Sequence, residues 1–146
     1  MRTLKKLNLL FSATTFVLLV ACGHSGPETI NINKDDCDNC KMSISDKRFA
    51  CELVTEKGRA YKFDDVTCMM SYKNDNKDKM TNAHFYINNY LLPNDLLLSD
   101  KLTFVEGENV SSPMGGNIAA FTNKDSAETY SVRWNAKIIN WQTINR

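Results

Sequence analysis

Three sulfur-bearing side chains lie within six positions of one polar stretch, DDCDNCKMSISD at residues 35–46. Cys37 and Cys40 form a Cys-x-x-Cys pair, a spacing that lets one turn aim two thiols at a common point. Met42 follows Cys40 by two residues, and in an extended segment these two side chains project to the same side. Two thiolates and one thioether suit a soft ion of low coordination number, Cu(I) before Zn(II). The alternative for Met42 is packing in a hydrophobic core.

The spacing of Cys37 and Cys40 supports a disulfide or a redox-active pair as well as it supports a metal site. The carboxylates of Asp35, Asp36 and Asp38 surround the pair and disfavour the thiolate that a strongly oxidising thiol catalyst needs. No histidine follows Cys40, which excludes covalent c-type haem attachment, and no second Cys-x-x-Cys supports a four-cysteine zinc ribbon. A metal site and a redox pair are therefore both open interpretations of this segment.

A second sulfur group follows in FDDVTCMM, residues 63–70. If Asp65 caps a helix here, Cys68 is its third residue, where the helix N-terminus lowers a thiol pKa and the sulfur faces outward. Val66, Met69 and Met70 have the i, i+3, i+4 spacing that is more typical of a core stripe than of ligands. Adjacent helical side chains diverge, so at most one of the two methionines is a ligand.

The remaining candidates are single residues. Met114 lies in SSPMGG, residues 111–116, a turn in which no local core can form, so it is either a thioether ligand or an exposed methionine without a role. His84 is a candidate nitrogen ligand, although a surface histidine is the simpler interpretation. Cys51 alternates with its neighbours in a predicted strand and is most simply a small buried hydrophobic residue, with a bond to Cys68 as the alternative.

The secondary-structure elements that must position these residues occur in the same order in each half of the chain. Residues 48–65 predict a hairpin divided at Lys57-Gly58, Asp64 or Asp65 then caps a helix over 66–75, and a strand follows over 83–92. The second half repeats this order as strands over 101–107 and 117–123, a helix over 124–134 capped by Asn123 or Asp125, and a final strand over 137–144. We therefore predict an α+β fold of two homologous small ββαβ units in tandem, each of about 45 residues, over 37–98 and 99–146.

The first residues do not belong to this fold. Three basic residues and an apolar run precede Leu19-Val20-Ala21-Cys22, which resembles the lipobox of bacterial lipoproteins. The resemblance implies a signal peptide over 1–21, cleavage before Cys22 and lipid attachment to its sulfur; an ordinary signal peptide is the alternative. Residues 22–36 are polar, with Gly, Pro and Ser, and predict a flexible lipidated tether.

Composition limits the partners and the compartment. Removing residues 1–21 takes away three of the 18 basic residues and leaves 15 against 17 acidic ones, a net charge of −2. No basic patch remains, which argues against nucleic acid as a partner. The mature protein is expected outside the cytoplasm, anchored to the membrane by lipid, where its four other cysteines can also oxidise. A lipoprotein with structural disulfides and a protein-binding surface is therefore a further interpretation.

The run CDNCKMSISDKRFACELVTEKGRAYKFDDVTCMMSY, together with PMGGNIAAFTNKDSAETY, resembles the NosL family, copper lipoproteins accessory to nitrous-oxide reductase. The resemblance implies two homologous ββαβ units, Cu(I) as cargo and no catalysis. It also implies delivery to the maturing copper centres of nitrous-oxide reductase through a membrane-bound ABC-type assembly complex, on the periplasmic side of a bacterial membrane. The site residues that it implies are Cys37, Cys40 and Met42 first, then Cys68 with Met69, and Met114.

Lys41 departs from the family pattern, which commonly has Gly between the second cysteine and the methionine. Gly would allow unusual backbone angles there, whereas Lys41 predicts an ordinary extended conformation. The competing function is an extracytoplasmic thiol–disulfide oxidoreductase that uses the same Cys37 and Cys40.

Overall fold

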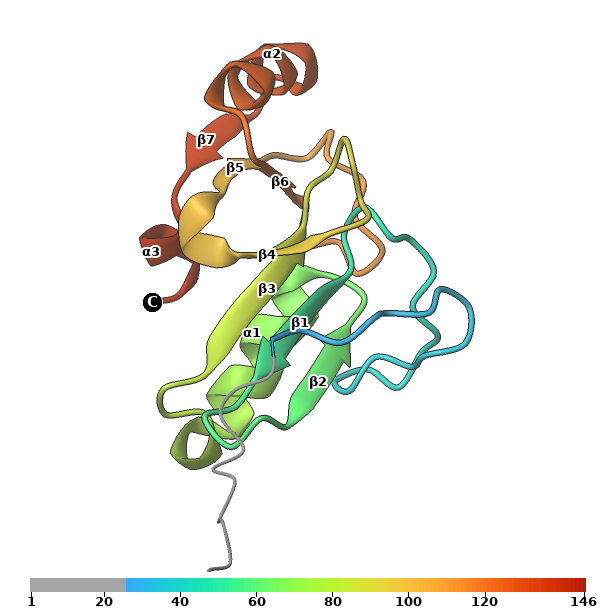
Figure 1. Ribbon diagram of the computed structural model, residues 1–146. Helices are drawn as coiled ribbons and strands as arrows, with labels where there is room; N and C mark the ends of the chain where they lie inside the picture. The colour runs from blue at the N-terminus through green and yellow to red at the C-terminus, as the bar shows by residue number, and fades with distance from the viewer. Residues whose placement is uncertain (1–25) are drawn as a thin grey trace, which may run out of the picture.

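The computed structural model describes residues 26–146, which form two antiparallel sheets and three α-helices (Figure 1). The predicted signal peptide, the lipidation site Cys22 and the first part of the predicted tether lie outside these residues. No helix within residues 26–146 is long and apolar enough to cross a membrane.

The first sheet has the strand order β2-β1-β3-β4, with every neighbouring pair antiparallel. Its strands are β1 (Cys51–Val54), β2 (Ala60–Phe63), β3 (His84–Asn88) and β4 (Leu96–Leu98). The helix α1 (Val66–Asp75) packs against β1 and β2, and the short 3-10 helix η1 (Lys77–Lys79) follows it. The predicted hairpin and helix are confirmed, and Gly58 adopts the positive φ of 81° that the turn requires.

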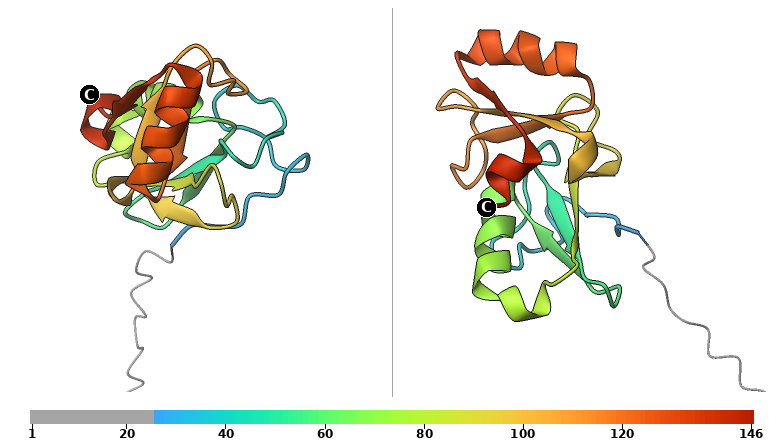
Figure 2. Two further views of the ribbon diagram at one scale, coloured as in Figure 1. Left: turned by 90° about the horizontal axis from the view of Figure 1, so that it is seen from above. Right: turned by 90° about the vertical axis from the view of Figure 1, so that its left-hand side faces the viewer.

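The second sheet has the order β6-β5-β7, and its helix lies on the side that faces away from the first sheet (Figure 2). Its elements are β5 (Thr103–Glu106), β6 (Ile118–Phe121), α2 (Lys124–Trp134) and β7 (Lys137–Ile139), preceded by η2 (Ser99–Lys101) and followed by α3 (Trp141–Ile144). Asn123 caps α2 as predicted, because its side chain accepts from two main-chain N–H groups of the first turn. The order β-β-α-β thus occurs in each half; descent of the halves from one duplicated unit stays a prediction.

Two predicted strands extend too far. The strand predicted over 83–92 ends at Asn88, and the chain returns as β4. The strand predicted over 137–144 ends at Ile139, and α3 follows with Asn140 as its cap. The physical reason for the second difference is tertiary, because Trp141 packs its ring against Phe85 and Phe104, with ring centroids 5.1 and 5.9 Å away.

One hydrophobic core joins the two halves. Leu53 and Phe63 of the first sheet belong to the same buried cluster as Phe104 and Ala120 of the second sheet and Trp141 of α3. The halves therefore share apolar surface, and each depends on the other to bury it.

Residues 26–30 lie alongside the first sheet (Figure 1), and Ile30 is the buried residue of the segment 26–36, whose other residues are exposed or partly exposed. Ile30 is 5% exposed and belongs to the main core cluster, and the Glu28 N–H donates to the Glu52 carboxylate at 2.9 Å. All four residues of β1 are buried, including the polar Glu52. Ile30 thus contributes to the core from within the segment 22–36, and the domain boundary at residue 36 stays a prediction.

Candidate metal centre: three converging cysteine thiols

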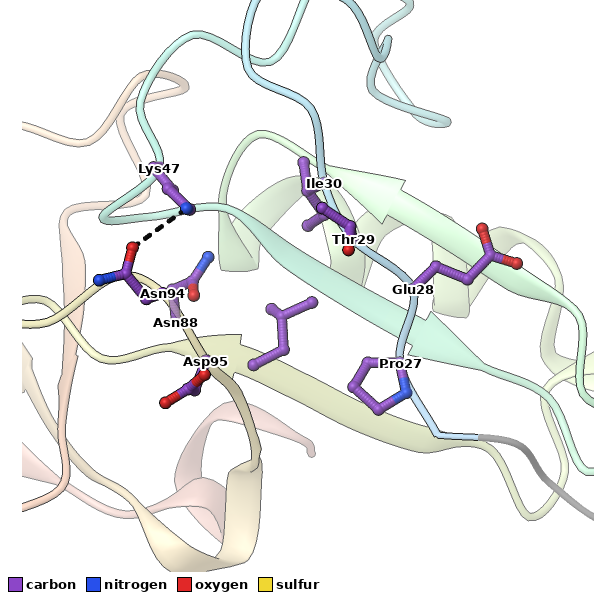
Figure 3. A pocket seen from close by; sticks show the side chains of 9 residues that line it. Pro27, Glu28, Thr29, Ile30, Lys47, Asn88, Asn94 and Asp95 are labelled. Atoms are coloured by element: carbon purple, nitrogen blue, oxygen red, sulfur yellow. Dashed lines mark hydrogen bonds between the residues drawn. The ribbon is translucent and has the colours of Figure 1, made fainter.

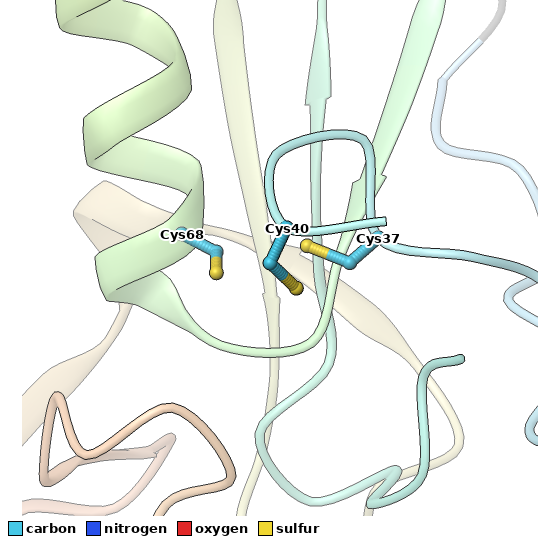
Figure 4. Close-up of side chains that lie close together, drawn as sticks. All are labelled: Cys37, Cys40 and Cys68. Carbon is cyan, nitrogen blue, oxygen red and sulfur yellow. The ribbon is translucent and has the colours of Figure 1, made fainter. Parts of the chain in front are cut away.

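Cys37, Cys40 and Cys68 bring their sulfur atoms together, all within 4.8 Å of one another (Figure 4). Cys37 and Cys40 come from the turn before β1, and Cys68 comes from the first turn of α1. Cys37 and Cys68 are buried, and Cys40 is partly exposed. Within the described residues, no histidine or carboxylate joins this group.

The turn that carries Cys37 and Cys40 is closed by two main-chain hydrogen bonds. The Lys41 N–H donates to the Cys37 carbonyl at 2.9 Å, and the Cys37 N–H donates to the Met42 carbonyl at 2.8 Å. Lys41 adopts a left-handed conformation with φ 63°, so the prediction of an extended Lys41 is wrong. The chain must reverse within these few residues, and the left-handed residue provides the reversal. Met42 is 50% exposed. Because the chain is not extended at Lys41, the spacing of Cys40 and Met42 no longer predicts that their sulfur atoms project to the same side.

Lys62 of β2 anchors the same turn to the first sheet. Asp38 and Lys62 exchange two hydrogen bonds of 2.8 Å: the Asp38 N–H donates to the Lys62 carbonyl, and the Lys62 N–H donates to the Asp38 carboxylate. The Lys62 ammonium also donates to Asp35 at 2.9 Å and to the Thr29 carbonyl at 2.8 Å. Hydrogen bonds from the Asn31 main chain and from Lys62 lower the pKa of Asp35. Two of the three aspartates near the thiols are therefore engaged by Lys62.

Asp65 caps α1 as one of the two predicted candidates, since its carboxylate accepts from the Cys68 N–H at 3.1 Å. The helix start does not lower the thiol pKa, however. Burial raises the pKa of Cys68 well above its ordinary value, and the neighbouring Cys37 and Cys40 add to this rise. Burial also raises the pKa of Cys40. Desolvation of the charged form is the main cause of these rises, so a bound cation must displace the thiol protons.

Asn39 is a site residue that the sequence reasoning missed. A hydrogen bond from its side chain to Cys68 opposes the rise in the pKa of that thiol. The amide is the part of Asn39 that can donate to a thiolate, and such a bond favours the charged form. Its place between Cys37 and Cys40 is the sequence signal that could have identified it.

The predicted methionine ligands lie in three different environments. Met69 is fully buried in the main core, as expected for a residue of the core stripe, and Val66 is buried with it. Met114 is half-buried and packs against the same core, and Met42 is half exposed. Their roles as copper ligands stay predictions.

The other two candidates lie outside the thiol cluster. Cys51 is fully buried in β1 and unbonded to Cys68, which agrees with the interpretation as a small hydrophobic residue. His84 is exposed at the start of β3, opposite Val54. All four cysteines within residues 26–146 are free thiols in this structure.

The thiol spacing suits one metal ion. A trigonal ion with metal–sulfur bonds of about 2.3 Å requires sulfur atoms about 4.0 Å apart, close to the observed limit. Three sulfur donors without nitrogen or oxygen favour a soft ion such as Cu(I), whereas structural zinc sites take four ligands. The cluster can therefore hold a soft ion after a small inward movement of the thiols.

The cavity shown in Figure 3 is separate from this cluster. It encloses about 240 Å³ between residues 27–30 and the segment 94–96, and Lys47 donates to Asn94 at 3.2 Å across its edge. None of the three cysteines lines it, so this cavity is not part of the candidate metal centre.

Comparison with known proteins identifies the family and the fold. No curated protein matches the chain. The crystal structure of the copper chaperone NosL from Shewanella denitrificans has a similar fold, with a TM-score of 0.68 at 19% sequence identity, over 80% of this chain and 93% of that one. The sequence profile of the NosL family matches residues 29–146, which is most of the chain. The protein therefore belongs to the NosL family.

Proposed function

We propose that this protein is a membrane-anchored, extracytoplasmic Cu(I) metallochaperone that delivers copper to maturing nitrous-oxide reductase. The observation that carries the proposal is the convergence of Cys37, Cys40 and Cys68 within 4.8 Å from two separate elements. Membership of the NosL family and a fold shared with a copper chaperone support it.

The cluster suits transfer of an ion rather than permanent storage. Cys37 and Cys68 are buried and exclude water from two sides, while Cys40 is partly exposed. A three-coordinate ion has an open position, so an acceptor ligand enters beside Cys40 before a donor sulfur leaves. Copper is cargo in this scheme, and the chain itself carries out no catalysis.

The proposed anchor and partners rest on the family and on chain length. A lipid on Cys22 would hold the domain close to the membrane, because the eight residues from Cys22 to the packed Ile30 span less than about 30 Å. The copper acceptor would then be a membrane-bound ABC-type assembly complex on the periplasmic side, which passes the ion to nitrous-oxide reductase.

The competing function, thiol–disulfide exchange by Cys37 and Cys40, fits the site less well. A nucleophilic thiol in such an enzyme has a lowered pKa, whereas burial raises the pKa of Cys40 and of its neighbour Cys68. A soft cation compensates for the same burial because it replaces the protons directly.

The decisive experiment measures Cu(I) affinity of the reduced mature chain by competition with a chromophoric chelator. We expect one Cu(I) per chain, and at least a tenfold loss of affinity in the Cys37→Ser/Cys40→Ser double variant. Cys51→Ala is the matched control, since Cys51 is a buried cysteine outside the cluster, and it should retain wild-type affinity. Unchanged affinity in the double variant, or rapid disulfide exchange without copper retention, would contradict the proposal.

Delivery is tested in a bacterium that produces nitrous-oxide reductase but lacks its own NosL. Expression of the wild-type chain should restore the copper content of the purified reductase, and the double variant should not. The Cys22→Ala variant should be found outside the membrane fraction, and it should restore less copper to the reductase.

A further inference from the structure

Asp65 lies between the two halves of the molecule and receives hydrogen bonds from both. One carboxylate oxygen accepts from the Cys68 N–H at 3.1 Å. The other oxygen accepts from the Ser112 hydroxyl at 2.8 Å and from the Met114 N–H at 3.2 Å. Asp65 is 1% exposed, so these three donors replace water around a buried carboxylate.

The loop over residues 112–117 is shaped to approach this carboxylate closely. A Cβ on Gly116 would lie 1.8 Å from the Thr67 hydroxyl and 3.3 Å from the Asp65 carboxylate, so only glycine fits there. The Ser112 hydroxyl that donates to Asp65 also accepts from the Asn117 N–H at 2.8 Å, which closes the loop on itself. The loop is therefore docked on the first turn of α1.

We propose that Asp65 is the positioning residue that fixes the Met114 loop of the second half against the thiol cluster of the first. A single rigid carboxylate holds the main chain of Cys68 and the main chain of Met114 at once. The loop is thereby held on the first turn of α1, which carries Cys68. Its half-buried methionine packs against the core that contains Cys37 and Cys68. This inference rests on the proposed copper-binding function of the cluster.

Asp65→Asn separates this role from helix capping. Asparagine caps helices about as well as aspartate, so the bond from the Cys68 N–H survives. An amide NH2 group replaces the oxygen that accepts from the Met114 N–H, so two hydrogen-bond donors face each other there. If the amide flips, its NH2 group faces the Cys68 N–H instead. Asp64→Asn is the matched control, because Asp64 is the adjacent buried carboxylate, and it accepts from the Ser45 N–H instead.

The first measurement is hydrogen exchange at the Met114 amide, which needs no copper. We expect exchange at least tenfold faster in Asp65→Asn than in the wild type, with little change in Asp64→Asn. Equal exchange in Asp65→Asn and the wild type would overturn the inference.

The second measurement is the rate at which a chelator removes Cu(I). We expect at least a threefold faster loss in Asp65→Asn, and a much smaller effect of the same change in a Met114→Leu background. A merely structural role would accelerate the loss equally in both backgrounds, and that result would overturn the inference. Failure of the wild type to retain Cu(I) would refute the proposed function instead, and the exchange comparison would still decide the role of Asp65.

Discussion

Lys41 has a side chain in a backbone conformation that favours glycine, with φ 63°. The left-handed region costs a residue with a Cβ about 1–2 kcal/mol. Its ammonium lies 3.8 Å from the Asp38 carboxylate, in an exposed pair that contributes little stability. The strain is retained because the turn must close between Cys37 and Met42 to bring the thiols together.

Lys41→Gly should therefore stabilise the protein by up to about 1 kcal/mol, since the relief of strain exceeds the extra chain entropy of glycine. Urea denaturation of the reduced protein measures the change. Lys34→Gly is the control, because Lys34 lies in the neighbouring turn and does not have a positive φ. This variant should lose about 0.5–1 kcal/mol of unfolding free energy. Equal destabilisation by both changes would contradict the strain at Lys41.

At the scale of elements, the segment 26–36 and the outer face of the first sheet meet at a buried carboxyl group. Glu52 accepts from the Glu28 N–H, and its second oxygen has no hydrogen-bond partner among the described residues. Burial raises the pKa of Glu52 to about 7, and the charges of Glu28 and Asp35 add to the rise while the Lys62 ammonium opposes it. Burial raises the pKa of Tyr86, the residue of β3 that pairs with Glu52, and the charge of Glu52 adds to the rise.

This carboxyl makes the stability of the fold depend on pH. Because its pKa is higher in the folded protein, the folded state holds a proton between pH 4.5 and about 7 that the unfolded chain has released. The contribution of Glu52 to stability is complete below pH 4.5 and is lost as pH rises through about 7.

Glu52→Gln should remove that loss. Between pH 4.5 and pH 8, the unfolding free energy of the variant should rise relative to that of the wild type by up to about 3 kcal/mol, as measured by urea denaturation. Glu56→Gln, at an exposed position of the β1–β2 turn, should follow the wild type at every pH. A constant difference between Glu52→Gln and the wild type across this range would rule out a raised pKa.

At the scale of the whole molecule, Trp141 connects the two sheets. It is 8% exposed and contacts Phe85 of β3 and Phe104 of β5. The shared core makes one cooperative unit of two halves that are each too small to bury enough apolar surface alone.

Trp141→Ala should cost about 3–5 kcal/mol of unfolding free energy and keep a single transition, because the cavity lies in the core that both halves share. Calorimetry measures both quantities. Val132→Ala, at a position 83% exposed on α2, should stay within about 0.5 kcal/mol of the wild type. Two separate transitions in the wild type would show that the halves fold independently.

The sequence by itself determined the local elements and the involvement of cysteine sulfur in the site. Alternation around Gly58 predicted the first hairpin, and Asp65 and Asn123 marked the starts of α1 and α2, because these signals act over a few residues. The Cys-x-x-Cys spacing identified two of the three clustered thiols, although the residues alone left a metal site and a redox pair equally supported.

Only the tertiary structure decided which groups meet and in what state. It placed Cys68 against a turn some 30 positions earlier in the chain and joined the Met114 loop to Asp65. It ended the predicted last strand at Ile139 and replaced its second part with α3 around Trp141. It also reversed the expected pKa shift of Cys68 and the expected conformation of Lys41. Each of these outcomes depends on burial and on contacts between distant residues, and no local pattern of residue types contains that information.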